Sequence, residues 1–420
     1  MHFKYNNKFF VLPLLKQNTK IMNTAQKEIV KATVPILKSS GNILVNYFYQ
    51  RMLKNNPELK NIFNMANQAN GKQQSALTGA VLAYAENIDD PSVLINVLKS
   101  IGNKHVSLHI LPEQYDIVGH HLIESIKEVL GDTATEDLVA AWVCAYGELA
   151  QIMISIEEEM YQKTANSKGG WKGWRTFIID KIVTESDEIK SFYLKPQDGN
   201  AIASFFPGQY ISIKTFVPEL GYDQPRQYSL SSSFNEEYYR ISIKSEKGRT
   251  TPDGIVSNVL HAKKAGDTID VTAPAGVFYA DPESINPLVL ISGGVGITPL
   301  MSMVEANKKA LQKNKTVWVH SCRNENVHAF KETIEDLNNN ENWLTSFVFY
   351  ETLPESPTNA IEGRAELHQY KEEIIINDAK YYICGPELFI RKQYQSLIEL
   401  GVTREAIFYE EFGPQLITLN

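Results

Sequence analysis

The chain has 420 residues, of which 43% are hydrophobic and 21% are charged. This length exceeds what one hydrophobic core organises, so two or three domains are expected, and the composition is that of a folded protein. The formal net charge is -8 and no basic cluster occurs, which argues against a nucleic-acid partner. The cysteines, Cys144, Cys322 and Cys384, are scattered, so they indicate neither a disulfide framework nor a paired zinc site, and a reducing cytoplasm is expected.

The first 21 residues are interpreted as a nonfunctional extension. They carry lysines and no acidic residue around the apolar run from Phe9 to Leu15, which is too short to span a bilayer. A signal peptide is an alternative, but its cleavage pattern of small residues is missing. The simpler interpretation is an upstream start codon with the functional chain beginning at Met22, and no transmembrane segment is expected.

Residues 22–165 are predicted to form an all-α domain. From about Gln26 to Lys163 the apolar residues recur at helical spacing, and strand-like alternation is almost absent. Residues 166–174 bear glycine and lysine and have the composition of an interdomain linker.

After the linker the periodicity changes to two, which predicts a small antiparallel β-barrel over residues 175–284. From residue 285 to 420, buried strands alternate with helices, beginning with Leu288 to Ser292, a glycine turn and a helix. This pattern predicts a doubly wound α/β domain, whose strands end at a nucleotide site. The expected barrel strands are Phe177 to Val183, Ile189 to Leu194, Tyr210 to Ile213, Tyr239 to Lys244 and Thr268 to Ala273.

The strongest motif is Arg226-Gln227-Tyr228-Ser229, which follows Tyr210 and precedes a segment that opens with Gly254. A guanidinium fork matches phosphate oxygens, and a helix start offers free N–H groups to a second phosphate. A lone Arg-x-Tyr-Ser is more often an ordinary strand, so the ordered set carries the prediction. The helix-opening residues are Gly254, Val256, Ser257 and Asn258.

Three further motifs follow in order. Glycines in the first allow a backbone to approach a pyrophosphate, and Thr298 can contact the nicotinamide side. Taken alone, any glycine turn is weak evidence, and Cys384 is a buried structural thiol. The motifs are Gly293-Gly294-Val295-Gly296 with Thr298 and Pro299, Cys384-Gly385-Pro386, and Phe412-Gly413-Pro414.

The ordered set resembles the ferredoxin-NADP reductase superfamily, which implies that these residues bind FAD and NADH or NADPH. In that family the arginine holds the pyrophosphate, the tyrosine and serine lie at the flavin, and the cysteine lies beside the hydride-transfer position. The resemblance also implies that Phe412 stacks on the isoalloxazine, whereas Glu411 stays unassigned. The choice between NADH and NADPH is open, because Ser321 and Arg323 could meet a 2′-phosphate or face solvent.

In the helical region, His105 lies on an apolar stripe with Leu98 and Ile101, where a lone histidine is usually a core residue. Gln73 and Leu77 lie four residues apart, so both can face one pocket. Together with the turn from Asn55 to Met65, these positions resemble the flavohaemoglobin family.

That resemblance implies a globin with noncovalent haem b, which agrees with the lack of a Cys-x-x-Cys-His motif. It makes His105 the iron ligand next to Lys104, with Tyr115 and Glu157 engaging the second ring nitrogen. The alternative for Glu157 is a solvated face beside Glu158 and Glu159. On the distal side it implies that Phe63 packs on haem, that Tyr49 and Gln73 form a polar pair and that Leu77 lies over the iron.

The whole resemblance implies a nitric oxide dioxygenase for nitric oxide detoxification. NAD(P)H would reduce FAD, FAD would reduce haem iron, and iron-bound oxygen would convert nitric oxide to nitrate. We expect a cytoplasmic monomer whose partners are the small molecules O2 and nitric oxide. Two alternatives stay open: an oxygen or nitric oxide sensor, and a globin-coupled flavin reductase for other acceptors.

Overall fold

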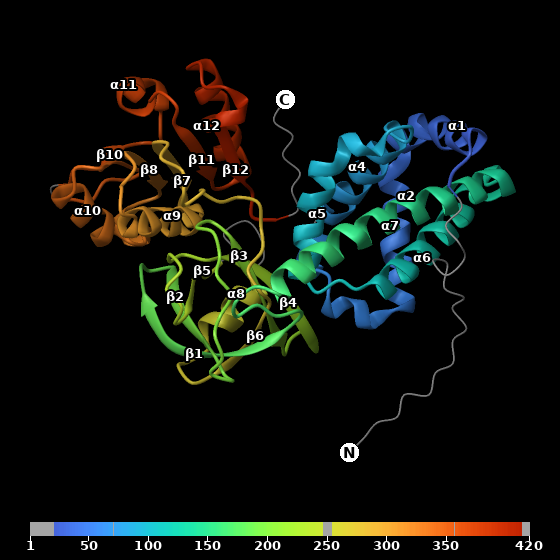
Figure 1. The fold of residues 1–420 in the computed structure, drawn as a ribbon, viewed down its shortest axis with the longest axis horizontal. Helices are drawn as coiled ribbons and strands as arrows, with labels where there is room; N and C mark the ends of the chain where they lie inside the picture. Colours follow the sequence, from blue (N-terminus) through green and yellow to red (C-terminus); the bar gives the residue numbers. More distant parts are fainter. Residues whose placement is uncertain (1–20, 70, 247–253, 357, 414–420) are drawn as a thin grey trace. The chain divides into compact units, whose positions relative to one another are not determined.

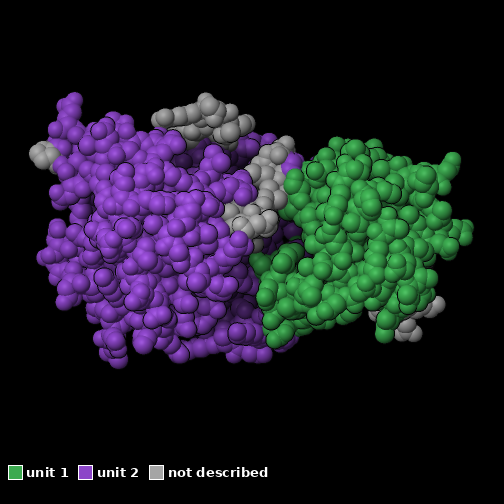
Figure 2. All heavy atoms as spheres, turned by 90° about the horizontal axis from the view of Figure 1, so that it is seen from above, with its two compact units in different colours: residues 1–59, 74–102, 110–159 green, residues 60–73, 103–109, 160–420 purple. Residues whose placement is uncertain are grey.

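The computed structural model describes residues 21–69, 71–246, 254–356 and 358–413. The chain forms two compact units (Figure 2). The division does not follow the linear order of the chain, because two short segments of the helical region cluster with the strands. Unit 1 contains Met1–Leu59, Gln74–Gly102 and Ile110–Glu159, and unit 2 contains Lys60–Gln73, Asn103–His109 and Met160–Asn420.

The region before the linker is helical, as its periodicity predicts (Figure 1). Its helices are α1 (Thr24–Ala32), α2 (Val34–Asn55), α3 (Met65–Ala69), α4 (Lys72–Glu86), α5 (Ile95–Ser107), α6 (Pro112–Leu130) and α7 (Glu136–Ala165). Asn23 and Gln26 form a reciprocal capping box that starts α1. Proline in the first turn starts α2 and α6, where its missing N–H removes no helical hydrogen bond.

The helices of unit 1 pack closely at glycines. A Cβ on Gly41 of α2 would lie 2.7 Å from Cγ2 of Thr78 on α4. A Cβ on Gly119 of α6 would lie 2.4 Å from the Tyr146 ring on α7. Such contacts leave no room for a side chain, so glycine sets how closely these helix pairs approach.

Among the described helices, α7 alone is long and apolar enough to cross a membrane on length and composition. The core helix of a water-exposed protein has the same properties. In α7, Ala141 and Ala145 are fully buried and Trp142 is nearly so. These side chains belong to the hydrophobic core of unit 1.

Unit 2 contains an antiparallel barrel with the strand order β4-β3-β6-β1-β2-β5. Its strands are β1 (Arg175–Thr184), β2 (Ile189–Pro196), β3 (Tyr210–Val217), β4 (Tyr222–Ser229), β5 (Tyr239–Lys244) and β6 (Thr268–Val271), with helix α8 (Ile255–His261). β4, which contains Pro225, is not among the strands expected from the periodicity. A bridge from Leu230 to Ile241 brings the end strands β4 and β5 together, and Pro225 is tolerated because an end strand has a free side.

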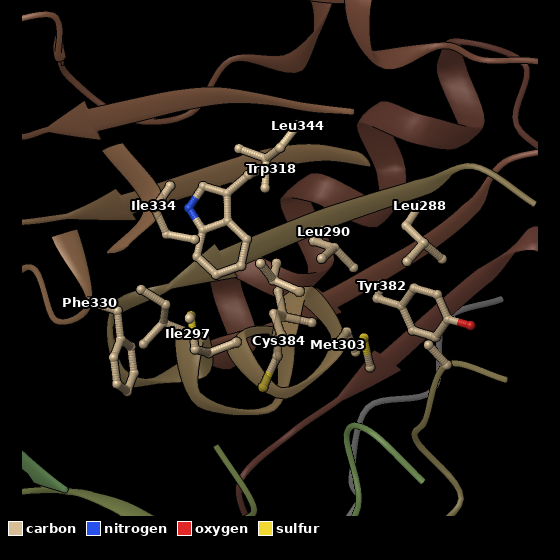
Figure 3. Packing of buried hydrophobic residues seen from close by; sticks show 14 of the residues in the cluster. Leu288, Leu290, Ile297, Met303, Trp318, Phe330, Ile334, Leu344, Tyr382 and Cys384 are labelled. Carbon is tan, nitrogen blue, oxygen red and sulfur yellow. The ribbon is translucent and has the colours of Figure 1, made fainter. Parts of the chain in front are cut away.

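The second sheet of unit 2 is parallel, with the order β10-β9-β8-β7-β11-β12. Its strands are β7 (Leu288–Gly293), β8 (Thr316–Cys322), β9 (Leu344–Tyr350), β10 (Ile361–Glu362), β11 (Lys380–Cys384) and β12 (Ile407–Glu410), and its helices are α9 (Ile297–Lys309), α10 (Lys331–Asn340), α11 (Lys371–Ile374) and α12 (Glu387–Glu399). Apolar clusters form on both faces, and Trp318, Leu290 and Ile297 lie in one of them (Figure 3). The strand order reverses at β7, which pairs with both β8 and β11. Ligands of doubly wound folds bind at such a reversal.

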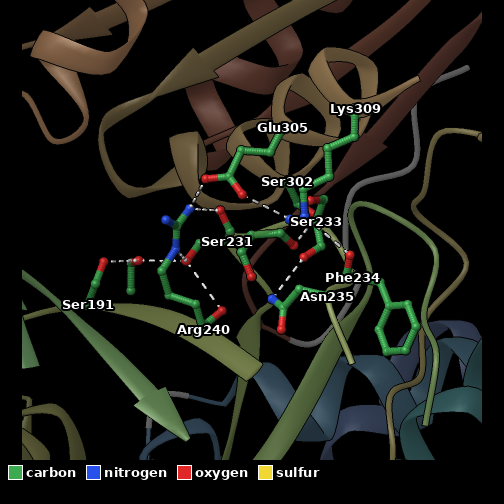
Figure 4. Close-up of polar contacts among 11 residues, drawn as sticks. Ser191, Ser231, Ser233, Phe234, Asn235, Arg240, Ser302, Glu305 and Lys309 are labelled. Atoms are coloured by element: carbon green, nitrogen blue, oxygen red, sulfur yellow. Dashed lines mark hydrogen bonds and ion pairs between the residues drawn. The ribbon is translucent and has the colours of Figure 1, made fainter. Parts of the chain in front are cut away.

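A polar cluster joins the barrel to α9 (Figure 4). Arg240 Nη2 on β5 lies 2.8 Å from Glu305 Oε1, and Glu305 Oε2 accepts from the Ser233 backbone N–H at 3.1 Å. The Ser302 hydroxyl donates to the Ser232 carbonyl at 2.8 Å. Because both charged groups have several partners, this largely buried ion pair is satisfied, and it orients α9 against the barrel.

Two stacked histidines are buried beside the parallel sheet. The rings of His320 and His328 lie 4.5 Å apart, with hydrogen bonds of 2.8 Å from His320 Nδ1 to the Ser292 hydroxyl and from His328 Nδ1 to the Tyr350 hydroxyl. Neither Nε2 atom has a hydrogen-bond partner in the described part of the chain. Burial lowers the pKa of His328 from 6.5 to about 4 and that of His320 well below 6.5, so both rings are neutral at pH 7.

We expect acid to destabilise this sheet. The depressed pKa of His328 means that its neutral form contributes stability above pH 6.5, and this contribution is lost as the pH falls toward 4. At pH 5 the loss for this single group is about 2 kcal/mol. Hydrogen exchange of the β8 amides, corrected for intrinsic rates, should therefore show less protection at pH 5 than at pH 7. His328→Asn should reduce the difference, and an unreduced difference would contradict the assignment.

Candidate functional site

Arg226 lies on β4 with its guanidinium largely removed from water. Its Nη1 donates to the Pro225 carbonyl at 2.7 Å and to Gln224 Oε1 at 3.3 Å. Burial lowers its pKa, and its only described electrostatic partner is the Tyr228 phenol, so no carboxylate among the described residues neutralises it. A buried guanidinium without an anion is costly by itself, so the group fits a phosphate ligand such as the pyrophosphate of FAD.

Tyr210, Tyr228 and Ser229 lie together on adjacent strands. The register of β3 and β4 places Tyr210 opposite Ser229 and Ile211 opposite Tyr228. Burial raises the pKa of both tyrosines, so their hydroxyls stay protonated hydrogen-bond donors at neutral pH. Gly276 has a φ of +114°, and a Cβ there would lie 2.9 Å from the Tyr210 ring, so the backbone closes over this tyrosine.

The segment from Gly254 to Asn258 opens α8, as predicted. Gly254 is the N-cap, and the Ser257 hydroxyl donates back to its carbonyl at 3.0 Å. Val256 is part of the barrel core, and Asn258 Oδ1 accepts from the Ser245 hydroxyl at 2.9 Å. The first N–H groups of a helix have no partner within the helix, so this end can bind an anion.

The glycine turn begins at the end of β7, where the strand order reverses. Gly294 has a φ of +54° and open space at its Cβ position, whereas a Cβ on Gly296 would lie 2.2 Å from the Cys384 carbonyl oxygen. Glycine at these positions therefore permits a left-handed turn and close contact between two backbones. The Thr298 hydroxyl donates to the Val295 carbonyl at 3.1 Å. Gly293 ends β7, and Pro299 lies buried in the first turn of α9.

The Cys384 turn lies beside the glycine turn, because Ser292 and Cys384 are register partners in β7 and β11. Cys384 is fully buried, and burial raises the pKa of its thiol well above the usual value. It is therefore a thiol rather than a thiolate at neutral pH. A Cβ on Gly385 would lie 3.2 Å from the Gly293 backbone. Pro386 is the N-cap of α12. This bare backbone fits a nucleotide that approaches the strand ends.

At the end of β12 lies a buried carboxylate that sequence analysis missed. Glu410 pairs in register with Cys384, and burial raises its pKa to about 8 although Lys104 opposes the shift. Burial lowers the Lys104 pKa, and its ammonium donates to the Gly413 carbonyl at 2.7 Å. Phe412 is 44% exposed. Pro414 lies outside the described residues, as does almost all of the predicted N-terminal extension.

In unit 1, Tyr115 on α6 donates a hydrogen bond of 2.5 Å to Glu157 on α7. Glu157 is 3% exposed, whereas Glu158 and Glu159 are exposed, so the solvated-face interpretation of Glu157 is wrong. The Tyr146 hydroxyl donates to the Tyr115 carbonyl at 2.6 Å, which holds the α6 backbone at this point. A buried carboxylate needs such a partner, and the pair fits the task of engaging an imidazole.

The other predicted haem residues belong to both units. Tyr49 on α2 and Leu77 on α4 are in unit 1, and Tyr49 is 4% exposed against the Phe48 ring. Phe63, Gln73 and the turn of α5 that bears Lys104 and His105 are in unit 2.

The Phe63 turn is held by Gln224, a fully buried residue that sequence analysis missed. The Gln224 Nε2 donates to the carbonyls of Lys60 and Phe63 at 2.7 and 3.2 Å, and its Oε1 accepts from the Met65 N–H at 3.2 Å. This residue precedes Arg226 by two positions, so the phosphate-binding strand also orders the Phe63 turn.

The His105 turn also contacts the barrel. Ser107, two residues beyond His105, is fully buried, and its Oγ accepts from Gln227 Nε2 at 2.7 Å. Ser107 also opposes the rise that burial causes in the pKa of Tyr210. Gln227 and Tyr210 are predicted from the sequence as cofactor-binding residues, but no local signal distinguishes Ser107.

The described residues contain no group of three or more histidine, cysteine and acidic side chains that could hold a metal ion. A single imidazole, that of His105, suits a metal that is already held by a macrocycle. Such a ligand set fits haem.

Family models match the three parts of the chain. A globin model covers residues 46–153, an oxidoreductase FAD-binding domain covers residues 176–279, and an oxidoreductase NAD-binding domain covers residues 290–395. These matches agree with the predicted order of a globin, an antiparallel barrel and a doubly wound α/β domain, which the fold confirms.

Two similar proteins cover almost the whole chain, and a third covers the reductase part. The crystal structure of a flavohemoglobin from Malassezia yamatoensis, with bound FAD and heme, has a TM-score of 0.82 and 27% identity over 94% of this chain and 100% of that one. The FAD/NAD-binding domain of a nitric oxide dioxygenase from Vibrio cholerae is 35% identical, with a TM-score of 0.51, over 57% of this chain and 99% of that one. A flavohemoprotein from Rhizobium meliloti is 49% identical over 93% of this chain and 98% of its own length. The chain therefore belongs to the flavohemoprotein family.

Proposed function

We propose that this flavohemoprotein is a nitric oxide dioxygenase that uses NADH or NADPH, FAD and haem b to convert nitric oxide and oxygen to nitrate. The observation that carries the proposal is the presence, in one chain of this family, of a desolvated Arg226 with no carboxylate partner among the described residues and a buried Tyr115–Glu157 pair. The Vibrio cholerae relative is named for the same reaction.

When bound, the nicotinamide supplies a hydride, FAD divides its electrons into single transfers, and haem iron is the centre at which oxygen and nitric oxide react. Arg226 would hold the FAD pyrophosphate with the start of α8, while Tyr228, Ser229 and Tyr210 enclose the flavin. The Gly294 turn would admit the nucleotide pyrophosphate, with Thr298 and Cys384 toward the nicotinamide. Phe412, which is partly exposed, would cover the flavin until nicotinamide replaces it.

On the globin side, His105 would ligate the iron, and Tyr115 with Glu157 would orient its imidazole and increase its basicity. Tyr49 would donate a hydrogen bond to a polarised ligand, and Gln73 would support it. Leu77 and Phe63 would provide apolar surface that excludes water from the reaction.

The remaining features follow from the same proposal. Arg323 is in contact with Glu188, which favours NADH, because a 2′-phosphate would have to displace that carboxylate. We propose a cytoplasmic monomer without a membrane span or nucleic-acid partner. The proposed domains are residues 22–165, 175–284 and 285–420, joined by a linker at 166–174 and preceded by an extension at 1–21.

The decisive test is His105→Ala, with the exposed His120→Ala as control. We expect His105→Ala to lose nearly all nitric oxide consumption, measured with a nitric oxide electrode, because the iron ligand is gone. Electron flow from NADH to a dye should persist, since the reductase residues are untouched. Unchanged nitric oxide consumption would refute the proposal and favour a flavin reductase for other acceptors.

Arg226→Ala should purify with little FAD. The change removes the cation that would meet the pyrophosphate, so a loss of roughly tenfold or more in FAD affinity is expected, measured as the flavin-to-protein ratio after dialysis. Arg364→Ala, an exposed arginine in the same unit, is the control and should retain FAD. A normal flavin content in Arg226→Ala would contradict the assigned role.

Glu157→Gln keeps an acceptor for the Tyr115 hydroxyl but removes the negative charge. We expect nitric oxide consumption to fall roughly 10- to 100-fold, because the imidazole loses a charged partner. The iron–histidine vibration, measured by resonance Raman spectroscopy, should shift to lower frequency. An unshifted vibration together with normal turnover would show that the carboxylate is only structural.

A further inference from the structure

Ser107 connects the His105 turn to the strands that carry the proposed flavin contacts. Its hydroxyl donates to the Lys104 carbonyl at 2.8 Å and accepts from Gln227 Nε2 at 2.7 Å. A side-chain interaction with Ser107 also opposes the burial-driven rise of the Tyr210 pKa. The Ser107 hydroxyl thus uses its single donor and one of its two lone pairs in hydrogen bonds.

Further contacts fix the backbone of the same turn to the barrel. The Thr272 hydroxyl donates to the Ser107 carbonyl at 3.1 Å. One turn earlier, Asn103 Oδ1 accepts from the Gly276 N–H at 3.1 Å. The segment Asn103–His109 accordingly clusters with the barrel in unit 2 rather than with the remaining helices.

Ser107 is fully buried, so the lost contacts could not be replaced freely by bulk water. Replacing it with alanine would leave the half-buried Gln227 amide as a donor without this acceptor. Such groups are costly, and they relieve the cost by moving. Because Gln227 lies on β4 between Arg226 and Tyr228, and His105 is the proposed iron ligand, the spacing between the two ends of the electron path would change.

We propose that Ser107 is a positioning residue for electron transfer from FAD to haem, and this inference rests on the proposed function. When both cofactors are bound, each transfer would move one electron from reduced flavin to ferric iron, and two transfers would return FADH⁻ to FAD with release of one proton. Ser107 takes no part in the electron transfers themselves. It holds the His105 turn and the flavin strands at a fixed distance, and the rate of electron transfer depends steeply on that distance.

The test uses the full-length holoprotein and Ser107→Ala, with Ser125→Ala as a matched control. Ser125 is also fully buried, and its described hydrogen bond is to the His121 carbonyl of its own helix at 2.7 Å. After anaerobic mixing with NADH in a stopped-flow instrument, flavin and haem reduction are followed at their separate absorption bands. We expect Ser107→Ala to slow haem reduction about tenfold while flavin reduction stays within about twofold. Ser125→Ala should change neither phase.

Hydrogen exchange provides a readout that does not depend on turnover. Residues 103–109 should lose protection in Ser107→Ala, and exchange in α7 should not change. If Ser107→Ala does not accumulate, Gln227→Met replaces it in this experiment, because it removes the same Gln227–Ser107 hydrogen bond from the other partner. In the double variant, haem reduction should be no slower than in the slower single variant, because both changes remove one shared contact.

The outcomes separate the two proposals. Haem reduction at the wild-type rate in Ser107→Ala, equal slowing of both phases, or multiplicative effects in the double variant would overturn the positioning role. If NADH fails to reduce haem in the wild-type protein itself, the proposed function fails instead.

Discussion

The constraint on which this structure depends is that the polar groups at the end of α5 must find partners away from water. A helix terminus leaves carbonyl groups without partners inside the helix, and a buried polar group without a partner is destabilising. The barrel supplies partners to this end of α5: Thr272 donates to the Ser107 carbonyl, Gly276 donates to the Asn103 side chain, and Gln227 donates to the Ser107 hydroxyl. The His105 turn therefore packs as part of the reductase unit, although it is continuous in sequence with the globin helices.

Nucleotide binding depends on a different property of the same unit. Where the strand order reverses, the site is lined by glycines that have no side chain. Gly296 lies against the Cys384 carbonyl, and the space at the Cβ position of Gly294 is open. At the barrel, the reverse holds, because Arg226 presents a desolvated charge without a carboxylate partner among the described residues. Exposed backbone N–H groups and a cation without a carboxylate partner both suit phosphate groups. The ion pair of Arg240 and Glu305 links the barrel to the α/β domain that contains the glycine turn.

Buried ionisable groups in this protein have different electrostatic environments. The buried Glu157 carboxyl accepts a hydrogen bond from the Tyr115 hydroxyl at 2.5 Å. Glu410 has a raised pKa because the opposing effect of Lys104 does not outweigh burial. His320 and His328 stay neutral because burial opposes their protonation. Each environment follows from the contacts that surround the group rather than from the residue type.

The sequence by itself determined the order of the domains, the family and most positions of the reductase motifs, because helical and strand periodicity and glycine or proline turns are local properties of a chain. It also indicated Glu157, but could not decide between a solvated and a buried carboxylate. Only the tertiary structure decided that question, since burial depends on which helix packs against α7. It also revealed Ser107, Gln224 and Glu410, whose partners lie far away along the chain, and no local pattern encodes such contacts.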